Sequence, residues 1–130
     1  MNRDRFSHTV FLLAGIYGLI VLLPGYFGEK MLAERMPPAV NHPEFYYGFL
    51  GVAVAWQVTF LVIAGDPARL RPIIPAAVLE KLAYAIACLA LLLTGRVPVI
   101  VAVVGGVDFV WGVLFVVAYS RLRAAEAAYS

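Results

Sequence analysis

The chain has 130 residues, of which 63% are hydrophobic and 14% are charged, and its formal net charge is +2. A soluble domain usually carries about 25% charged residues, so this composition and a mean hydropathy of +0.89 exclude an ordinary soluble domain. The positive charge forms no basic patch along the sequence, so we expect no nucleic-acid partner. The single cysteine, Cys88, excludes an internal disulfide and a site built from several thiolates.

Four apolar segments have the length that a helix needs to cross a membrane. They cover residues 9–27, 45–65, 73–94 and 97–119, close to the about 20 residues that span the hydrocarbon. The segments occupy most of the chain, so we expect one transmembrane domain over residues 1–130. Most connections are short, which places consecutive helices antiparallel. The predicted fold is therefore an all-α integral membrane four-helix bundle with up-down-up-down topology.

Lys and Arg residues that flank the segments predict the orientation, because they are enriched in cytoplasmic loops. Six lie on the side of the two termini and of the connection between the second and third segments: Arg3, Arg5, Arg69, Arg71, Arg121 and Arg123. The opposite side carries three: Lys30, Arg35 and Arg96. This excess predicts that both termini are cytoplasmic.

The longest connection, residues 28–41, has a helical pattern of its own. Apolar side chains recur there near helical spacing, with charged residues between them: Phe27, Met31, Leu32 and Met36. This pattern predicts a short amphipathic helix on the outer leaflet, ended by Pro37 and Pro38. An irregular loop is the alternative, and the sequence does not choose between the two.

Three charged residues interrupt the last two segments: Glu80 and Lys81 in the third, and Asp108 in the fourth. A charge near the centre of a spanning helix costs about 2.5–3.5 kcal/mol on a translocon-insertion scale, so these residues need pairing, neutralisation or hydration. Helical spacing puts Glu80 and Lys81 beside a polar, small-residue face, opposite a Leu/Ile/Val surface for lipid. We expect the long Lys81 side chain to reach Asp108. Gly105 and Gly112 share the helix face of that carboxylate and predict close packing of a neighbouring helix.

Polar side chains from all four segments fall at similar depths. A helix rises about 1.5 Å per residue, which puts Glu80 and Gln57 about 12 Å from the cytoplasmic ends of their segments. Tyr17 lies about 15 Å and Asp108 about 20 Å from those ends. We therefore predict one polar layer across the bundle, made of Tyr17, Gln57, Glu80, Lys81, Tyr84, Asp108 and Trp111. Which face of the second segment turns inward stays open.

Two interpretations of this layer are open. In the first, Lys81 forms a structural ion cluster with Glu80 and Asp108 that fixes helix packing. In the second, the layer lines a cavity or a proton site, because ionisable residues inside a membrane are commonly functional. Our preferred hypothesis is a non-enzymatic membrane protein that binds a small lipophile, or an accessory subunit of a membrane complex. Its expected partners are the lipid bilayer, a lipophilic small molecule, and a membrane protein or a second copy of the chain.

The alternative hypothesis is a membrane-embedded enzyme with isomerase-like acid–base chemistry, or a proton-coupled carrier. Glu80 and Asp108 are then the candidate catalytic residues, as proton acceptors. The sequence has no phosphate loop, nucleophile elbow or paired-histidine haem arrangement, so we expect no cofactor. His42 and Glu44 form an H-x-E pair, but a metal site needs at least one more ligand and none is obvious, so we expect no metal.

Two short strings resemble those of small, uncharacterised bacterial four-span membrane proteins: residues 42–49 (HPEFYYGF) and residues 79–81 (LEK). In layout the chain also resembles DoxX-like proteins, which are four-helix bundles of similar length. The resemblance implies a multi-pass protein of the bacterial cytoplasmic (inner) membrane, and it transfers no functional residue. Small multidrug exporters have the same size and span number, but their essential acidic residue lies in the first span. The first segment here has no acidic residue between His8 and Gly28, which argues against that family.

Overall fold

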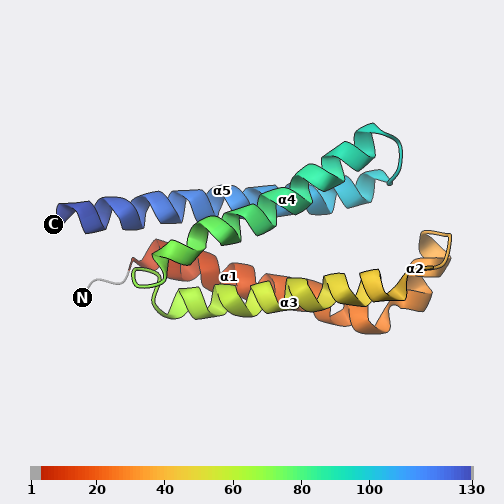
Figure 1. The fold of residues 1–130 in the computed structure, drawn as a ribbon, viewed down its shortest axis with the longest axis horizontal. Helices are drawn as coiled ribbons and strands as arrows, with labels where there is room; N and C mark the ends of the chain where they lie inside the picture. The colour runs from red at the N-terminus through yellow and green to blue at the C-terminus, as the bar shows by residue number, and fades with distance from the viewer. Residues whose placement is uncertain (1–3, 130) are drawn as a thin grey trace.

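The computed structural model describes residues 4–129, and all regular secondary structure within them is helical (Figure 1). Its elements are α1 (Arg5–Leu22), the 3-10 helix η1 (Leu23–Phe27), α2 (Glu29–Arg35), α3 (Pro43–Gly65), the 3-10 helix η2 (Arg71–Ile73), α4 (Ile74–Leu93) and α5 (Val99–Ala128). The all-helical prediction is confirmed, and four of the helices are long and apolar enough to cross a membrane. Arg3, used in the orientation argument, lies outside the described residues.

Local chemistry explains most helix ends. Pro43 is the first residue of α3, a position where the missing backbone N–H removes no helical hydrogen bond. Gly95 has a φ of 71° and lets the chain reverse between α4 and α5. The largest difference from prediction is at α5, which continues to Ala128 where we expected the span to end at Tyr119. The segment beyond the apolar run (SRLRAAEAA) is rich in helix formers and has no Gly or Pro, so the helix extends past the hydrophobic stretch.

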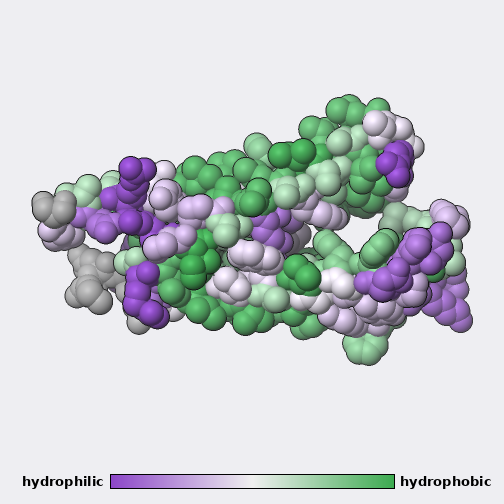
Figure 2. Space-filling model, viewed as in Figure 1, coloured by the Kyte–Doolittle hydropathy of each residue, from purple (hydrophilic) through white to green (hydrophobic). Residues whose placement is uncertain are grey.

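The long helices are arranged as two hairpins. α1 lies beside α3, and α4 lies beside α5 (Figure 1). The hairpins meet at the end of the molecule that carries the α3–α4 connection, which we call the closed end. They diverge toward the opposite end, which carries α2 and the α4–α5 turn, and Figure 2 shows a hollow between them there. We call this hollow the inter-hairpin opening.

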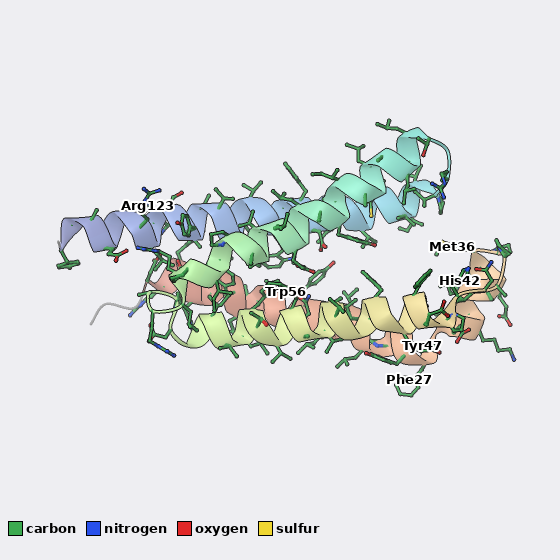
Figure 3. All side chains as sticks on the ribbon, viewed as in Figure 1. Phe27, Met36, His42, Tyr47, Trp56 and Arg123 are labelled. Carbon is green, nitrogen blue, oxygen red and sulfur yellow. The ribbon has the colours of Figure 1, made fainter. Side chains whose placement is uncertain are left out.

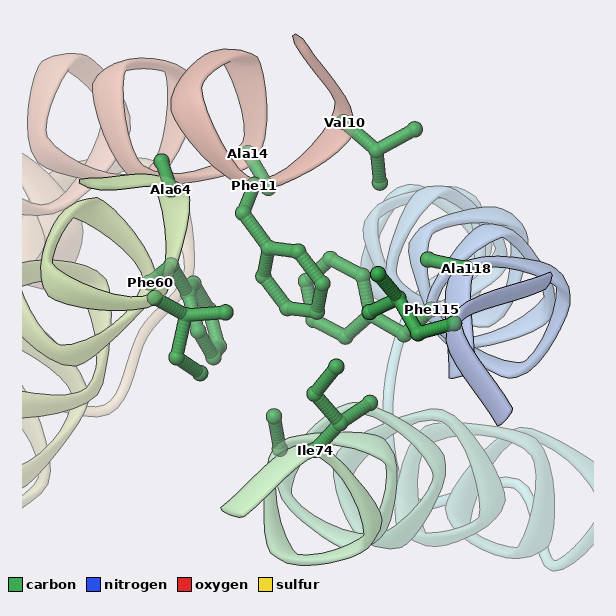
Figure 4. Packing of buried hydrophobic residues seen from close by; sticks show 11 residues of the cluster. Val10, Phe11, Ala14, Phe60, Ala64, Ile74, Phe115 and Ala118 are labelled. Atoms are coloured by element: carbon green, nitrogen blue, oxygen red, sulfur yellow. The ribbon is translucent and has the colours of Figure 1, made fainter. Parts of the chain in front are cut away.

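The closed end is filled by three fully buried phenylalanines from three different helices. The Phe11 ring on α1 stacks on Phe115 of α5 with ring centroids 4.3 Å apart, and Phe60 of α3 lies 4.9 Å from Phe115. Ile74, at the start of α4, closes the cluster, so all four long helices contribute (Figure 4). Small residues on the same faces, such as Ala14, let the backbones approach. The phenylalanine core was not among the residues singled out from the sequence.

Polar contacts fasten α5 to the rest of the closed end. The Arg121 guanidinium donates a hydrogen bond to the Asp4 carboxylate over 3.2 Å, and the Ser7 hydroxyl donates to the same carboxylate over 2.7 Å. Arg71 of η2 forms an ion pair with Glu126, near the end of α5. Burial raises the pKa of Asp4, but the hydrogen bonds from Arg121 and Ser7 outweigh burial, so this pKa lies below its ordinary value of 3.8.

The connection between the first two spans contains the predicted short helix, α2, instead of an irregular loop. It ends at Arg35, just before the two prolines. Two tyrosines of α3 hold this segment in place. Tyr46 donates a hydrogen bond to the Gly25 carbonyl over 2.6 Å, and Tyr47 donates to the Glu29 carboxylate over 2.7 Å. The connection is therefore a folded cap on the α1–α3 hairpin.

Candidate functional site

Lys81 is the buried centre of an ion cluster in the α4–α5 hairpin. Its side chain is 4% exposed, and its ammonium donates a hydrogen bond to Asp108 over 3.4 Å, which confirms the predicted reach. The same ammonium lies 3.7 Å from the Glu80 carboxylate. It also lies 5.2 Å from the centroid of the Phe60 ring, within the range of a cation–π contact. The cluster therefore sits directly beside the phenylalanine core.

The carboxylates of this cluster outnumber its ammonium group. The Asp108 side chain is 15% exposed and that of Glu80 17%, so both carboxylates are largely removed from solvent contact. The Glu80 Oε2 atom is buried and has no hydrogen-bond partner among the described residues. Its 3.7 Å separation from Lys81 is too long for a hydrogen bond. With all three groups ionised the cluster carries one excess negative charge and an unused acceptor.

Two glycines of α5 allow the helix approach that builds the cluster. A Cβ atom at Gly112 would lie 2.9 Å from the Leu82 side chain and 3.5 Å from the Lys81 Cβ. One at Gly105 would lie 2.6 Å from the Cys88 Cβ. Larger residues at either position would push α5 away from α4. The predicted role of these glycines in close packing is confirmed.

Two aromatic contacts join the two hairpins. Tyr17 of α1 and Trp111 of α5 have ring centroids 6.0 Å apart, and Phe49 of α3 stacks with Tyr84 of α4 at 5.8 Å. Trp111 lies three residues after Asp108, so it shares that side of α5. Tyr84 lies one turn beyond Glu80 and Lys81 along α4, so its contact with Phe49 joins the two hairpins next to the ions.

Gln57 does not join this cluster. Its side chain is 1% exposed, and its Nε2 donates a hydrogen bond to the Ala53 carbonyl over 2.9 Å. Its Oε1 faces Gly18 of α1, where an added Cβ would lie 1.8 Å away. The face of α3 that carries Gln57, Ala53 and Leu50 is therefore the inward one, which settles the choice left open by the sequence.

The predicted polar layer thus divides into separate parts. Glu80, Lys81 and Asp108 form one ion cluster within a single hairpin, whereas Gln57 belongs to the α1–α3 interface. Tyr17 contacts Trp111 of α5, three residues after Asp108. The prediction grouped these residues by depth along their helices, but depth does not determine which way each side chain points.

The structure adds two aromatic residues that the sequence did not single out as part of the site. Phe49 and Phe60 contact Tyr84 and Lys81 respectively, and each comes from α3. Trp56 packs against the phenylalanine core, with its ring centroid 6.3 Å from Phe60 (Figure 3). Because every apolar residue of a spanning segment raises hydropathy alike, no sequence signal separates these rings from lipid-facing ones.

The two histidines contact groups outside the ion cluster. His42 Nδ1 lies 3.1 Å from Glu44 Oε1, and both side chains are exposed. His8 Nδ1 lies 2.7 Å from the Ala64 carbonyl oxygen at the closed end. Within residues 4–129, no three His, Cys, Asp or Glu side chains gather as metal ligands would. No protein-family model, curated protein or solved structure matches this chain, so the resemblance to DoxX-like proteins stays a prediction.

Proposed function

We propose that this chain is a multi-pass membrane protein that binds a small lipophile in the inter-hairpin opening. The polar group of the lipophile contacts the ion cluster of Glu80, Lys81 and Asp108. The observation that carries this proposal is the buried Glu80 Oε2, which lies 3.7 Å from the Lys81 ammonium and accepts no hydrogen bond from any described residue. A buried acceptor of this kind is costly to leave unpaired, so a ligand that supplies a donor is stabilised there.

The orientation belongs to the same proposal. Arg5, Arg69, Arg71 and Arg121 all flank spans at the closed end. Lys and Arg are enriched on the cytoplasmic side of membrane proteins, so we assign the closed end and both termini to the cytoplasm. The inter-hairpin opening then faces the opposite leaflet. The membrane itself is assigned to the bacterial cytoplasmic membrane on the resemblance alone.

The charge of the site selects the chemistry of the ligand. One ammonium balances only one of the two carboxylates, so the site favours a protonated amine or another group rich in hydrogen-bond donors. The rings of Tyr17 and Trp111 beside it also favour a cation over an anion. A lipophile that ends in a carboxylate or phosphate would meet the excess negative charge and bind more weakly. The proposed ligand is therefore a lipophilic amine or a donor-bearing lipophile.

The excess of carboxylates over ammonium groups supports a second candidate function. Lys81 supplies one positive charge to two carboxylates, so the cluster becomes neutral when one carboxyl group takes up a proton. A proton-coupled carrier or an acid–base enzyme requires a group that accepts a proton in this way. Glu80 and Asp108 are the two candidate acceptors, at 3.7 Å and 3.4 Å from the Lys81 ammonium. This candidate uses the same opening, and it adds turnover or transport to binding.

The test is purification of the whole chain from native membranes in a lipid-preserving system, followed by mass spectrometry of the retained molecules. We expect a basic or donor-rich lipophile with the wild-type chain and its loss from Glu80→Gln. Glu44→Gln is the matched control, because it removes an exposed carboxylate outside the cluster. Equal retention by both variants would exclude the cluster as the site. A stoichiometric protein partner with no lipophile would make the chain an accessory subunit instead.

A further inference from the structure

A cavity lies away from the ion cluster, between η1, α2 and the start of α3. Its volume is about 360 Å³, and its lining includes Val21, Met31, Leu32, Arg35, Met36 and Tyr46. We call it the α2 groove. The ion cluster contributes no residue to it, so the inference below does not rest on the proposed function.

The α2 groove is apolar except at one place. Arg35 is the only charged residue that lines it, and no ion pair with Arg35 is found among the described residues. The hydroxyl of Tyr46, which also lines the groove, already donates to the Gly25 carbonyl. The groove therefore offers one unpaired guanidinium beside a surface of aliphatic and thioether side chains.

The position of the groove corresponds to the headgroup level of a membrane. Val21 lies near the end of α1, one turn beyond Tyr17 on the same face, and Tyr46 lies in the first turn of α3. Both are at the ends of candidate spans, where the hydrocarbon gives way to headgroups. The neighbouring Phe27 is 93% exposed and Met31 is 55% exposed, as side chains in contact with lipid would be.

We propose that the α2 groove binds an anionic phospholipid of the surrounding leaflet. The Arg35 guanidinium contacts the phosphate, for which its planar set of donors is well suited. Val21, Met31 and Leu32 contact the upper part of one acyl chain. Charge complementarity selects an anionic lipid, because the groove has a single positive charge and no negative charge in its lining.

Lys30 provides a matched control on the same short helix. It lines a separate cavity on the other side of the segment, together with Glu29 and Tyr47, so its surroundings already contain a carboxylate. Lys30→Ala and Arg35→Ala remove the same charge from the same helix. The two variants differ in the cavity from which the charge is removed: the α2 groove for Arg35→Ala and the separate cavity for Lys30→Ala.

The experiment is native mass spectrometry of the full chain in mixed micelles that contain equal amounts of phosphatidylglycerol and phosphatidylcholine. We expect wild type and Lys30→Ala to retain phosphatidylglycerol preferentially. Arg35→Ala should retain it about fivefold less, which equals the about 1 kcal/mol that one basic residue contributes at a membrane surface. Arg35→Lys keeps the charge and should keep most of the retention. Leu32→Trp fills the groove and should release the lipid although the charge remains.

Three results would overturn the proposal. The first is equal loss of phosphatidylglycerol in Arg35→Ala and Lys30→Ala, and the second is equal retention of the two lipids by wild type. The third is displacement by millimolar inorganic phosphate, which would mean a site for a free anion. If circular dichroism shows that Leu32→Trp does not fold, the comparison of Arg35→Ala with Lys30→Ala still tests the proposal. Loss of the amine-type lipophile in Glu80→Gln tests the ion cluster separately.

Discussion

Replacing Lys81 by methionine is the most direct test of how the ion cluster stabilises the fold. Methionine has a similar length and flexibility but carries no charge. The change leaves the carboxylates of Glu80 and Asp108 largely buried with no countercharge. We therefore expect a large loss of stability from a substitution that alters packing little.

The magnitude follows from the geometry. The Lys81 ammonium lies 3.4 Å from Asp108 and 3.7 Å from Glu80. At an effective dielectric constant of about 20, each separation corresponds to about 4.5–5 kcal/mol of attraction before desolvation is counted. Desolvation of the ions offsets much of this attraction, and breaking a buried pair typically costs about 3–5 kcal/mol. We expect that range for Lys81→Met, because the lysine is almost fully buried.

The assay is the free energy of unfolding in mixed dodecylmaltoside and SDS micelles, followed by far-UV circular dichroism. The single variant should lose about 3–5 kcal/mol. Adding Asp108→Leu should recover only part of the loss, because Glu80 still lacks a countercharge. Adding Glu80→Gln as well should recover most of it. If Lys81→Met stays within about 1 kcal/mol of wild type, as an exposed pair would, the cluster is hydrated and the argument from burial is wrong.

The same titration checks three further expectations. Gly18→Ala places a methyl group 1.8 Å from the side-chain oxygen Oε1 of Gln57. It should lower the free energy of unfolding by about 1–3 kcal/mol. Gly106→Ala is the control and should leave stability unchanged, because nothing lies within 4 Å of the added methyl group. Phe11→Ala empties the phenylalanine core and should cost about 3–5 kcal/mol, while Phe27→Ala, at a 93% exposed position, should change nothing. Asp4→Asn should destabilise at pH 7. The folded pKa of Asp4 is lowered, so its contribution is fully present above 3.8 and is lost as the pH falls through the lowered value. The difference between Asp4→Asn and wild type should therefore vanish in acid, and a difference independent of pH would contradict the assignment.

The spans and the central ion pair were predictable from the sequence because both depend on local patterns. Hydropathy over about 20 residues identifies a spanning helix without knowledge of its neighbours. Lys81 and Asp108 stand out because charges are rare in such segments and must find partners there. The glycines beside Asp108 were informative for a related reason, since only small residues permit close backbone contact.

The rest of the site depends on rotation and on contacts between distant segments, which the sequence pattern does not contain. The spanning segments are apolar throughout, so the sequence does not distinguish core residues from lipid-facing ones. The three core phenylalanines could not be identified for this reason: Phe11, Phe60 and Phe115. Gln57 was grouped with the ions by its expected depth alone, but its side chain packs against Gly18 of α1, because the rotation of α3 decides which interface it enters. The divergence of the two hairpins is likewise a property of packing, and span counting does not reveal it.

The confinement of the ion cluster to one hairpin has a consequence for biogenesis. Glu80 and Lys81 are adjacent on α4, and Asp108 comes from α5, the next helix to leave the ribosome. Each charge therefore meets a partner within the second hairpin, without waiting for α1 or α3. The translocon can release that hairpin into lipid with Lys81 already beside both carboxylates, and the phenylalanine core then forms when two inserted hairpins dock side by side.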